Sequence, residues 1–104
     1  TTREALAWVT TEGARMLRQS HRIGSLAAGK QADLVLIRAS DLNMQPVHDA
    51  VNSVVMQTSL ANIDSVMVAG QWKKRLGQLV GVNLVPHLAA LKASGQKIAH
   101  AMSL

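Results

Sequence analysis

The sequence predicts an α+β fold in which a small sheet lies between an N-terminal and a C-terminal amphipathic helix. Three observations support this prediction. Apolar residues recur at helical spacing near both ends, a continuous apolar run in the first half is typical of a buried strand, and a glycine-containing turn joins two further strand-like segments. The length of 104 residues fits one small structural unit.

Residues 3–18 form the first predicted helix. Thr1 or Thr2 can cap it, and Glu4 lies in its first turn, where the helix dipole favours an acid. Its apolar stripe consists of Leu6, Val9, Gly13, Met16 and Leu17. The absence of a side chain at Gly13 predicts close approach to a neighbouring element.

A turn and a strand are expected next. Residues 23–30 contain Gly24 and Gly29 and are typical of a strand end followed by a tight turn. Residues 33–38 place four apolar residues in a row between Asp33 and Arg38. Such a run predicts a strand buried on both faces, and this strand needs covering layers on two sides.

The middle of the chain combines a loop, a helix and a hairpin. Residues 39–48 predict a polar loop, and valines at helical spacing favour a short helix over residues 49–56, although that segment is ambiguous. Alternation over residues 63–68, a turn at 69–71 and a returning strand at 72–76 predict a β-hairpin. A second turn is expected at 77–78, leading to residues 79–80.

The C-terminal segment predicts a second amphipathic helix, with Pro86 near its first turn. Its apolar seam follows alternating spacings of four and three residues and consists of Leu84, Leu88, Leu91, Gly95, Ile98 and Met102. Because this seam is narrow and continuous, it is expected to lie on another surface.

Composition narrows the class of protein. The absence of cysteine excludes disulfides and thiolate metal sites and suits a cytoplasmic protein. No apolar run approaches the roughly 18 residues that a membrane span requires, and no signal-peptide core is present. The net charge is +5, but the only basic cluster is Lys73-Lys74-Arg75. The other basic residues are dispersed, and there is neither a basic stripe nor a set of stacking aromatics. Nucleic acid is therefore not the expected partner.

Histidines and acids offer no clear catalytic constellation. No two of the histidines (His21, His48, His87 and His100) have the short spacing that points two imidazoles at one metal. The acids are Glu4, Glu12, Asp33, Asp41, Asp49 and Asp64. Glu4 and Glu12 suit a solvated helix face, and Asp33 suits the capping of turn amides. A general acid–base site needs two such groups brought together in a cleft. The sequence alone does not decide whether two of these acids meet in this way.

Two further motifs fail their patterns. Ser25 follows Gly24 but lacks the Gly-x-Ser-x-Gly context of a nucleophile elbow. The segment from Gly24 to Lys30 differs from a phosphate-binding loop in its spacing, and a strand rather than a helix is expected after it. We therefore assign no catalytic, cofactor-binding or metal-binding residue to this chain.

Three segments in order resemble the amidohydrolase superfamily. The segment 24–37 (GSLAAGKQADLVLI) closely resembles its GSL-x-x-GK-x-ADLV stretch. Upstream, residues 10–17 (TTEGARML) look like its T-x-x-GA-x-x-L helix, and residues 66–72 (VMVAGQW) are similar to its V-x-V-x-G hairpin. The chlorohydrolase and cytosine-deaminase-like branch is the most similar one.

The resemblance implies a role for each part of the chain. Residues 1–20 would match a late helix of a (β/α)₈ barrel, residues 21–80 the C-terminal share of a small β-sandwich, and residues 81–104 a final helix on the barrel or a neighbouring subunit. All three are treated as one structural unit. The family's metal ligands, an early His-x-His pair, later histidines and an aspartate, would all lie before Thr1.

The leading hypothesis is a non-catalytic C-terminal fragment of a metal-dependent amidohydrolase. The parent would use a divalent metal, zinc or iron, to hydrolyse C–N or related bonds of a small ring-nitrogen compound. Expected partners are the missing barrel and, through exposed apolar faces, further copies of the chain. The alternatives are a free-standing small α/β oligomerisation or binding module and, third, a basic nucleic-acid-binding domain centred on Lys73-Lys74-Arg75.

Overall fold

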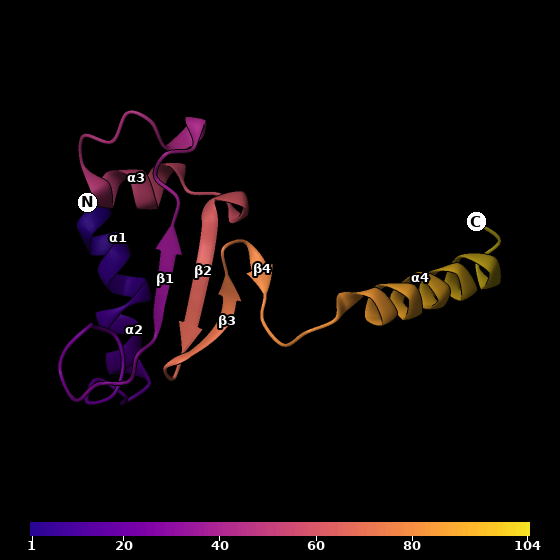
Figure 1. The fold of residues 1–104 in the computed structure, drawn as a ribbon, viewed down its shortest axis with the longest axis horizontal. Helices are drawn as coiled ribbons and strands as arrows, with labels where there is room; N and C mark the ends of the chain where they lie inside the picture. The colour runs from indigo at the N-terminus through magenta and orange to yellow at the C-terminus, as the bar shows by residue number, and fades with distance from the viewer.

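A computed structural model describes all residues, 1–104, and shows an α+β arrangement around one antiparallel sheet (Figure 1). The sheet has four strands in the order β1-β2-β3-β4. In chain order the elements are α1 (Thr2–Val9), α2 (Thr11–Met16), β1 (Leu34–Ile37), α3 (Ala50–Gln57), β2 (Ile63–Val68), β3 (Gln71–Arg75), β4 (Gln78–Leu79) and α4 (Leu84–Ala101). The predicted fold class is confirmed, with one sheet in this chain.

The first helix is interrupted, so the prediction of one continuous helix over 3–18 is wrong. Thr1 caps α1 by accepting the Glu4 N–H, as expected. At Thr10 the backbone leaves helical geometry (φ −119°, ψ −93°), and the Thr10 hydroxyl donates to the Leu6 carbonyl at 2.7 Å. This side-chain bond competes with the helical ladder. The chain therefore restarts as α2 at Thr11.

The hairpin prediction is confirmed, with sharper turns than expected. Val68 pairs with Gln71, so only Ala69 and Gly70 form the loop, and both have positive φ (52° and 76°). Two such residues make a type I′ turn, whose twist matches that of the strands. The second turn is Leu76-Gly77 (φ 49° and 79°), one residue earlier than predicted, because Arg75 pairs with Gln78.

Strand β1 is confirmed, but its burial is not. β1 is an edge strand that pairs only with β2, with Val35 opposite Val66. Val35 and Leu36 point to opposite faces and remain 52% and 48% exposed. Neither face of β1 is buried within this chain, so the two covering layers that the sequence predicted are absent from it.

The predicted polar loop contains a short 3₁₀ turn, Leu42–Met44. Met44 is only 1% exposed and is one of two buried hydrophobic residues. The helix predicted over 49–56 is confirmed as α3, which Asp49 caps by accepting the Asn52 N–H at 3.0 Å. α3 contacts α1, and the Thr2 hydroxyl donates to the Asn52 side chain between them.

The C-terminal helix is confirmed as α4, capped by Asn83. Figure 1 shows α4 projecting away from the sheet, on the side opposite α1 and α2. None of its residues is buried. Its apolar seam therefore lies on no surface of this chain.

The molecule is extended. Its radius of gyration is 18.4 Å, whereas a compact domain of this length has about 13 Å. It exposes 8153 Å², against about 5,700 Å² for a compact protein of its mass. The surplus of about 2,500 Å² includes large apolar side chains from every helix. In addition, no helix combines the length and the hydropathy that a bilayer crossing requires.

Candidate functional site

The histidines lie in separate parts of the fold. His21 is in the turn after α2, His48 precedes α3, and His87 and His100 occupy opposite ends of α4. No three side chains of the types that bind metals lie close together.

The acids are engaged in local structural bonds. Glu12 pairs with Arg15 at 2.7 Å on α2. Arg38 pairs with Asp41 at 3.4 Å and with Asp64 at 3.3 Å. The Ser65 hydroxyl and then Arg38 lower the pKa of Asp64. A general acid near neutral pH needs a raised pKa, so this carboxylate is poorly suited to that role.

Asp33 ties the resemblance segment to the hairpin. Its carboxylate accepts the Ala69 N–H at 2.7 Å and the Gln31 side-chain amide at 3.0 Å. These two bonds, the backbone one foremost, lower the pKa of Asp33. The Gly70 N–H donates to the neighbouring Ala32 carbonyl at 2.9 Å. Asp33 does accept a turn amide, but the turn is the one between β2 and β3, 36 residues further along the chain, and not the expected turn just before Asp33.

The loop from Gly24 to Lys30 closes on itself and on α2. The Lys30 ammonium donates to the Ser25 hydroxyl at 2.9 Å. A Cβ added at Gly24 would lie 2.6 Å from the Cβ of Ala14, so this glycine permits the loop to contact the helix. Gly13 permits a different contact, between α2 and α1, because a Cβ added to it would lie 3.1 Å from the Trp8 carbonyl of α1. The two glycines are packing residues.

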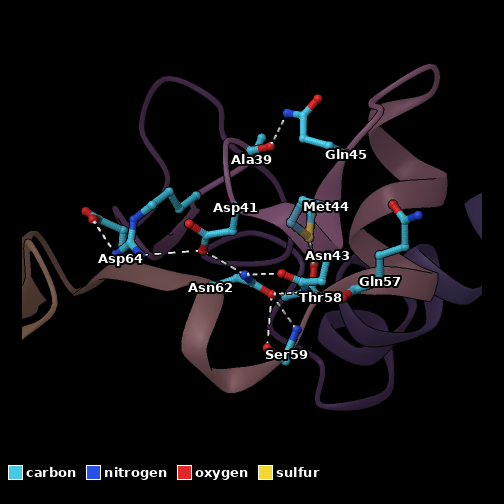
Figure 2. Close-up of polar contacts among 11 residues, drawn as sticks. Ala39, Asp41, Asn43, Met44, Gln45, Gln57, Thr58, Ser59, Asn62 and Asp64 are labelled. Atoms are coloured by element: carbon cyan, nitrogen blue, oxygen red, sulfur yellow. Dashed lines mark hydrogen bonds and ion pairs between the residues drawn. The ribbon is translucent and has the colours of Figure 1, made fainter.

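The densest polar cluster surrounds Asn62 (Figure 2). Asn62 is 2% exposed, and its carbonyl oxygen accepts the Ser59 N–H at 2.8 Å and the Asn43 amide at 2.8 Å. Its own amide donates to Asp41 at 2.8 Å and back to Asn43 at 2.9 Å. The cluster joins two separate segments, residues 41–43 and 59–62, and the chain has no buried side-chain polar atom without a partner.

Sequence reasoning missed the Asn62 cluster. One signal was present: Ser59 and Asn62 have the spacing of a capping box, and the structure shows that pair at the start of a 3₁₀ turn. The contributions of Asp41 and Asn43 carried no local signal, because they come from a distant loop. The amide and carboxylate groups of the cluster are engaged with one another and with Gln57 and Arg38, so the cluster acts as a structural tie.

Two open hollows mark the surface. The first, about 510 Å³, lies between α1–α2 and the following loop, and half of its lining is hydrophobic, including Leu6, Val9 and Leu26. The second, about 490 Å³, lies beside α3 and is lined mainly by polar residues, among them His48 and Asp49. Asp49 already caps α3, and its pKa is lowered by the Asn52 N–H. Neither hollow brings an acid and a base into an enclosed cleft.

Positive charge is concentrated in the second part of the chain. All six acids lie within residues 1–64, where they balance six cations, so residues 65–104 carry the whole net charge of +5. In the basic cluster, Arg75 lies over the Trp72 ring, 5.0 Å from its centroid. Lys73, Lys74 and Arg75 alternate along one short strand. They do not form the continuous stripe that a nucleic-acid backbone requires.

Comparison with known proteins decides the family. Residues 1–73 match the sequence profile of the amidohydrolase family. The chain belongs to the amidohydrolase family. The resemblance of its three segments to that superfamily is thereby confirmed.

Several amidohydrolase relatives are deaminases. Over 94 residues the chain is 35% identical to an 8-oxoguanine deaminase of Pseudomonas aeruginosa, covering 90% of this chain and 20% of that protein. Over 67 residues it is 39% identical to a 5-methylthioadenosine/S-adenosylhomocysteine deaminase of Teredinibacter turnerae, covering 64% and 15%. The chain thus spans about a fifth or less of the length of these relatives.

Solved amidohydrolase structures share the arrangement. An adenosine deaminase of Xanthomonas campestris with bound zinc matches with a TM-score of 0.89 and 29% identity, covering 96% of this chain and 23% of that one. An atrazine chlorohydrolase of Arthrobacter aurescens, complexed with zinc, matches with a TM-score of 0.79 and 26% identity, covering 89% and 20%. Both solved relatives contain zinc, and this chain covers about a fifth of each.

Proposed function

We propose that this chain is the non-catalytic C-terminal part of a metal-dependent amidohydrolase, in which it supports a catalytic barrel. One observation carries the proposal. The chain keeps the arrangement of a much larger solved deaminase, yet exposes 8153 Å², where a compact protein of its mass exposes about 5,700 Å². Its helices and β1 therefore present surfaces that a larger structure covers.

Each segment has a distinct part in this proposal. Residues 1–20 are the late barrel helix, whose exposed Val9 and Leu17 face the barrel. Residues 21–80 are the C-terminal share of the sandwich, whose second sheet covers β1. Asp33 and Asn62 hold that sheet in shape through the bonds described above. Residues 81–104 reach beyond both parts.

The relatives support a C–N bond as the target. Those named above include deaminases of 8-oxoguanine, 5-methylthioadenosine and adenosine. We infer that the intact protein removes the exocyclic amino group of an aminopurine or a similar ring-nitrogen compound. A divalent metal, zinc by similarity to the solved relatives or else iron, would supply the activated water from the barrel. A cytoplasmic location belongs to the same proposal.

Metal content and ammonia release test the proposal. We expect the intact protein to carry stoichiometric zinc or iron by elemental analysis and to release ammonia from at least one of guanine, 8-oxoguanine, adenosine and 5-methylthioadenosine. Chelation should abolish the activity, and the same metal should restore it. The matched control is a polypeptide of residues 1–104, which should show neither property.

The alternatives predict different results. Stoichiometric metal or hydrolysis by residues 1–104 alone would contradict the non-catalytic role. An intact protein without metal or ammonia release would favour a free-standing α/β oligomerisation or binding module. Strong, steeply salt-dependent binding to DNA or RNA, lost on replacing Lys73-Lys74-Arg75, would favour the nucleic-acid-binding alternative.

A further inference from the structure

Helix α4 presents an apolar seam with no partner in this chain. Leu88, Leu91 and Ile98 are 57%, 69% and 59% exposed. Gly95 interrupts the seam, and a Cβ added there would meet nothing within 4 Å. Glycine in a helix interior costs about 1 kcal/mol relative to alanine. Nothing within the chain explains a glycine at this position.

The direction of α4 bears on what covers the seam. Figure 1 shows α1 and α2 on one side of the sheet and α4 extending away on the other, along a long axis of 51 Å. Under the proposed function the barrel of the same protein lies on the α1–α2 side. The zinc-bound adenosine deaminase covers 96% of the chain with a TM-score of 0.89, so nearly all of α4 shares its place there. Under the proposed function, α4 therefore extends away from that barrel.

The seam is symmetric under reversal. Its residues, Leu84, Leu88, Leu91, Gly95, Ile98 and Met102, are spaced four, three, four, three and four apart. When two such helices run antiparallel and cross at Ala93, Leu84 faces Met102, Leu88 faces Ile98, and Leu91 faces Gly95. Every large side chain then meets an apolar partner, and Leu91 fills the space that Gly95 leaves open.

The charges of α4 agree with that register. Lys92 then faces Ser94 of the other copy, and Lys97 faces Ala89, so no cation lies opposite another. The two lysines are five residues apart, or about 140° around the helix, and do not form one basic face. This distribution suits a helix partner better than an anionic lipid surface or a nucleic-acid backbone.

The available area is sufficient. A stable dimer buries about 800 Å² per partner, and the chain exposes about 2,500 Å² more than a compact protein of its mass. A helix of 18 residues is about 27 Å long. Contacts with a barrel and with a second copy can therefore both be accommodated. Closed two-fold pairing also uses the same face of both copies, as a reversal-symmetric seam allows.

We propose that α4 is a dimerisation helix that pairs antiparallel with α4 of a second copy. The two-fold axis crosses the helices level with Ala93, whose side chain lies on the face opposite the seam. The choice of a second copy over the protein's own barrel rests on the proposed function, which places that barrel beside α1 and α2. Gly95 determines the register, because it receives Leu91 of the partner.

The test compares charge-matched variants of the intact protein. L88E places a carboxylate in the seam, and A93E places the same group on the outer face. At micromolar concentration, light scattering should give twice the monomer mass for wild type and A93E and the monomer mass for L88E. G95L, which improves helix propensity but blocks the place of Leu91, should raise the dissociation constant at least about tenfold.

Metal content and ammonia release are measured on the same samples. Failure of the proposed function can then be distinguished from failure of the dimerisation proposal. Monomeric L88E that keeps wild-type metal and activity supports the dimerisation helix. A monomeric wild type, a dimeric L88E, or an unweakened G95L dimer would overturn it. A variant with unchanged mass but a lower melting temperature would assign the seam to the protein's own barrel. Co-sedimentation with anionic phosphatidylserine vesicles, lost in L88E, would assign it to lipid.

Discussion

Gly24 and Ala14 bring the loop after α2 directly onto that helix. A methyl group at Gly24 would lie 2.6 Å from the Ala14 Cβ and 3.2 Å from the Thr10 carbonyl, and the φ of +95° already disfavours a side chain. Gly29 has a similar φ of +84° but open space around it. A substitution at Gly29 therefore adds backbone strain alone, whereas a substitution at Gly24 adds the same strain and a steric overlap.

We expect G24A to destabilise the intact protein by about 2 kcal/mol more than G29A, because only G24A adds overpacking to the strain. Chemical denaturation measures the difference. In an A14G background the extra cost of G24A should shrink, since the methyl group that it strikes is gone. Equal costs for G24A and G29A would show that the close approach is unimportant.

Asp33 should make the hairpin turn sensitive to acid. Its pKa is lowered by the Ala69 N–H and by Gln31, whereas the unfolded chain keeps about 3.9. The unfolded state therefore takes up its proton first as the pH falls. The stabilisation is complete above about pH 5 and is lost as the pH falls through the lower, folded pKa.

Hydrogen exchange at the Ala69–Gly70 turn measures this effect. We expect the wild type to be protected severalfold more than D33A from pH 7 to about 5, and the ratio to fall toward one in stronger acid. D33N keeps an acceptor oxygen without a charge, so its protection relative to D33A should vary little with pH. A wild-type ratio that stays constant into strong acid would be incompatible with this role of Asp33.

Among the elements, the segment before β2 depends on Asn62. We expect N62A to cost about 2–4 kcal/mol, because it removes a buried side chain with several hydrogen bonds and leaves Asp41, Asn43 and Ser59 without their shared partner. Denaturation of the intact protein gives the value. N52A, at an exposed asparagine of α3, is the control and should stay within about 1 kcal/mol of wild type. Similar losses of unfolding free energy in N62A and N52A would refute the structural role of Asn62.

Elements with local signals were predictable. The Thr1 cap, the Asp49 helix and the Ala69-Gly70 turn each depend on neighbours in sequence, and each was found. The break at Thr10 was missed because threonine is tolerated inside helices, and its bond to the Leu6 carbonyl leaves no signal in the sequence. The Asn62 cluster was missed because two of its partners, Asp41 and Asn43, lie 21 and 19 residues earlier in the chain. The exposure of β1 shows that an apolar run predicts a buried strand but does not tell which part of a structure buries it.

For the whole molecule, the proposed function predicts that residues 1–104 are poorly stable when separated from the barrel. Only Ala14 and Met44 are buried hydrophobic residues, which is too small a core for an independently stable domain. We expect isolated residues 1–104 to bind a hydrophobic dye and to increase in mass with concentration. The intact protein should show no comparable dye binding. A compact monomer with a radius of gyration near 13 Å would refute this expectation.

Because the positive charge is concentrated in residues 65–104, the pairing of α4 should depend on ionic strength. Pairing of α4 would bring together two segments that each carry the net +5 of residues 65–104, so mutual repulsion opposes association over roughly 30 Å in dilute buffer of about 0.01 M ionic strength. Added electrolyte screens that repulsion and should tighten the dimer. Attachment to a polyanion has the opposite dependence, because salt competes for the phosphates. The sign of one salt titration thus separates self-recognition from attraction to an acidic polymer.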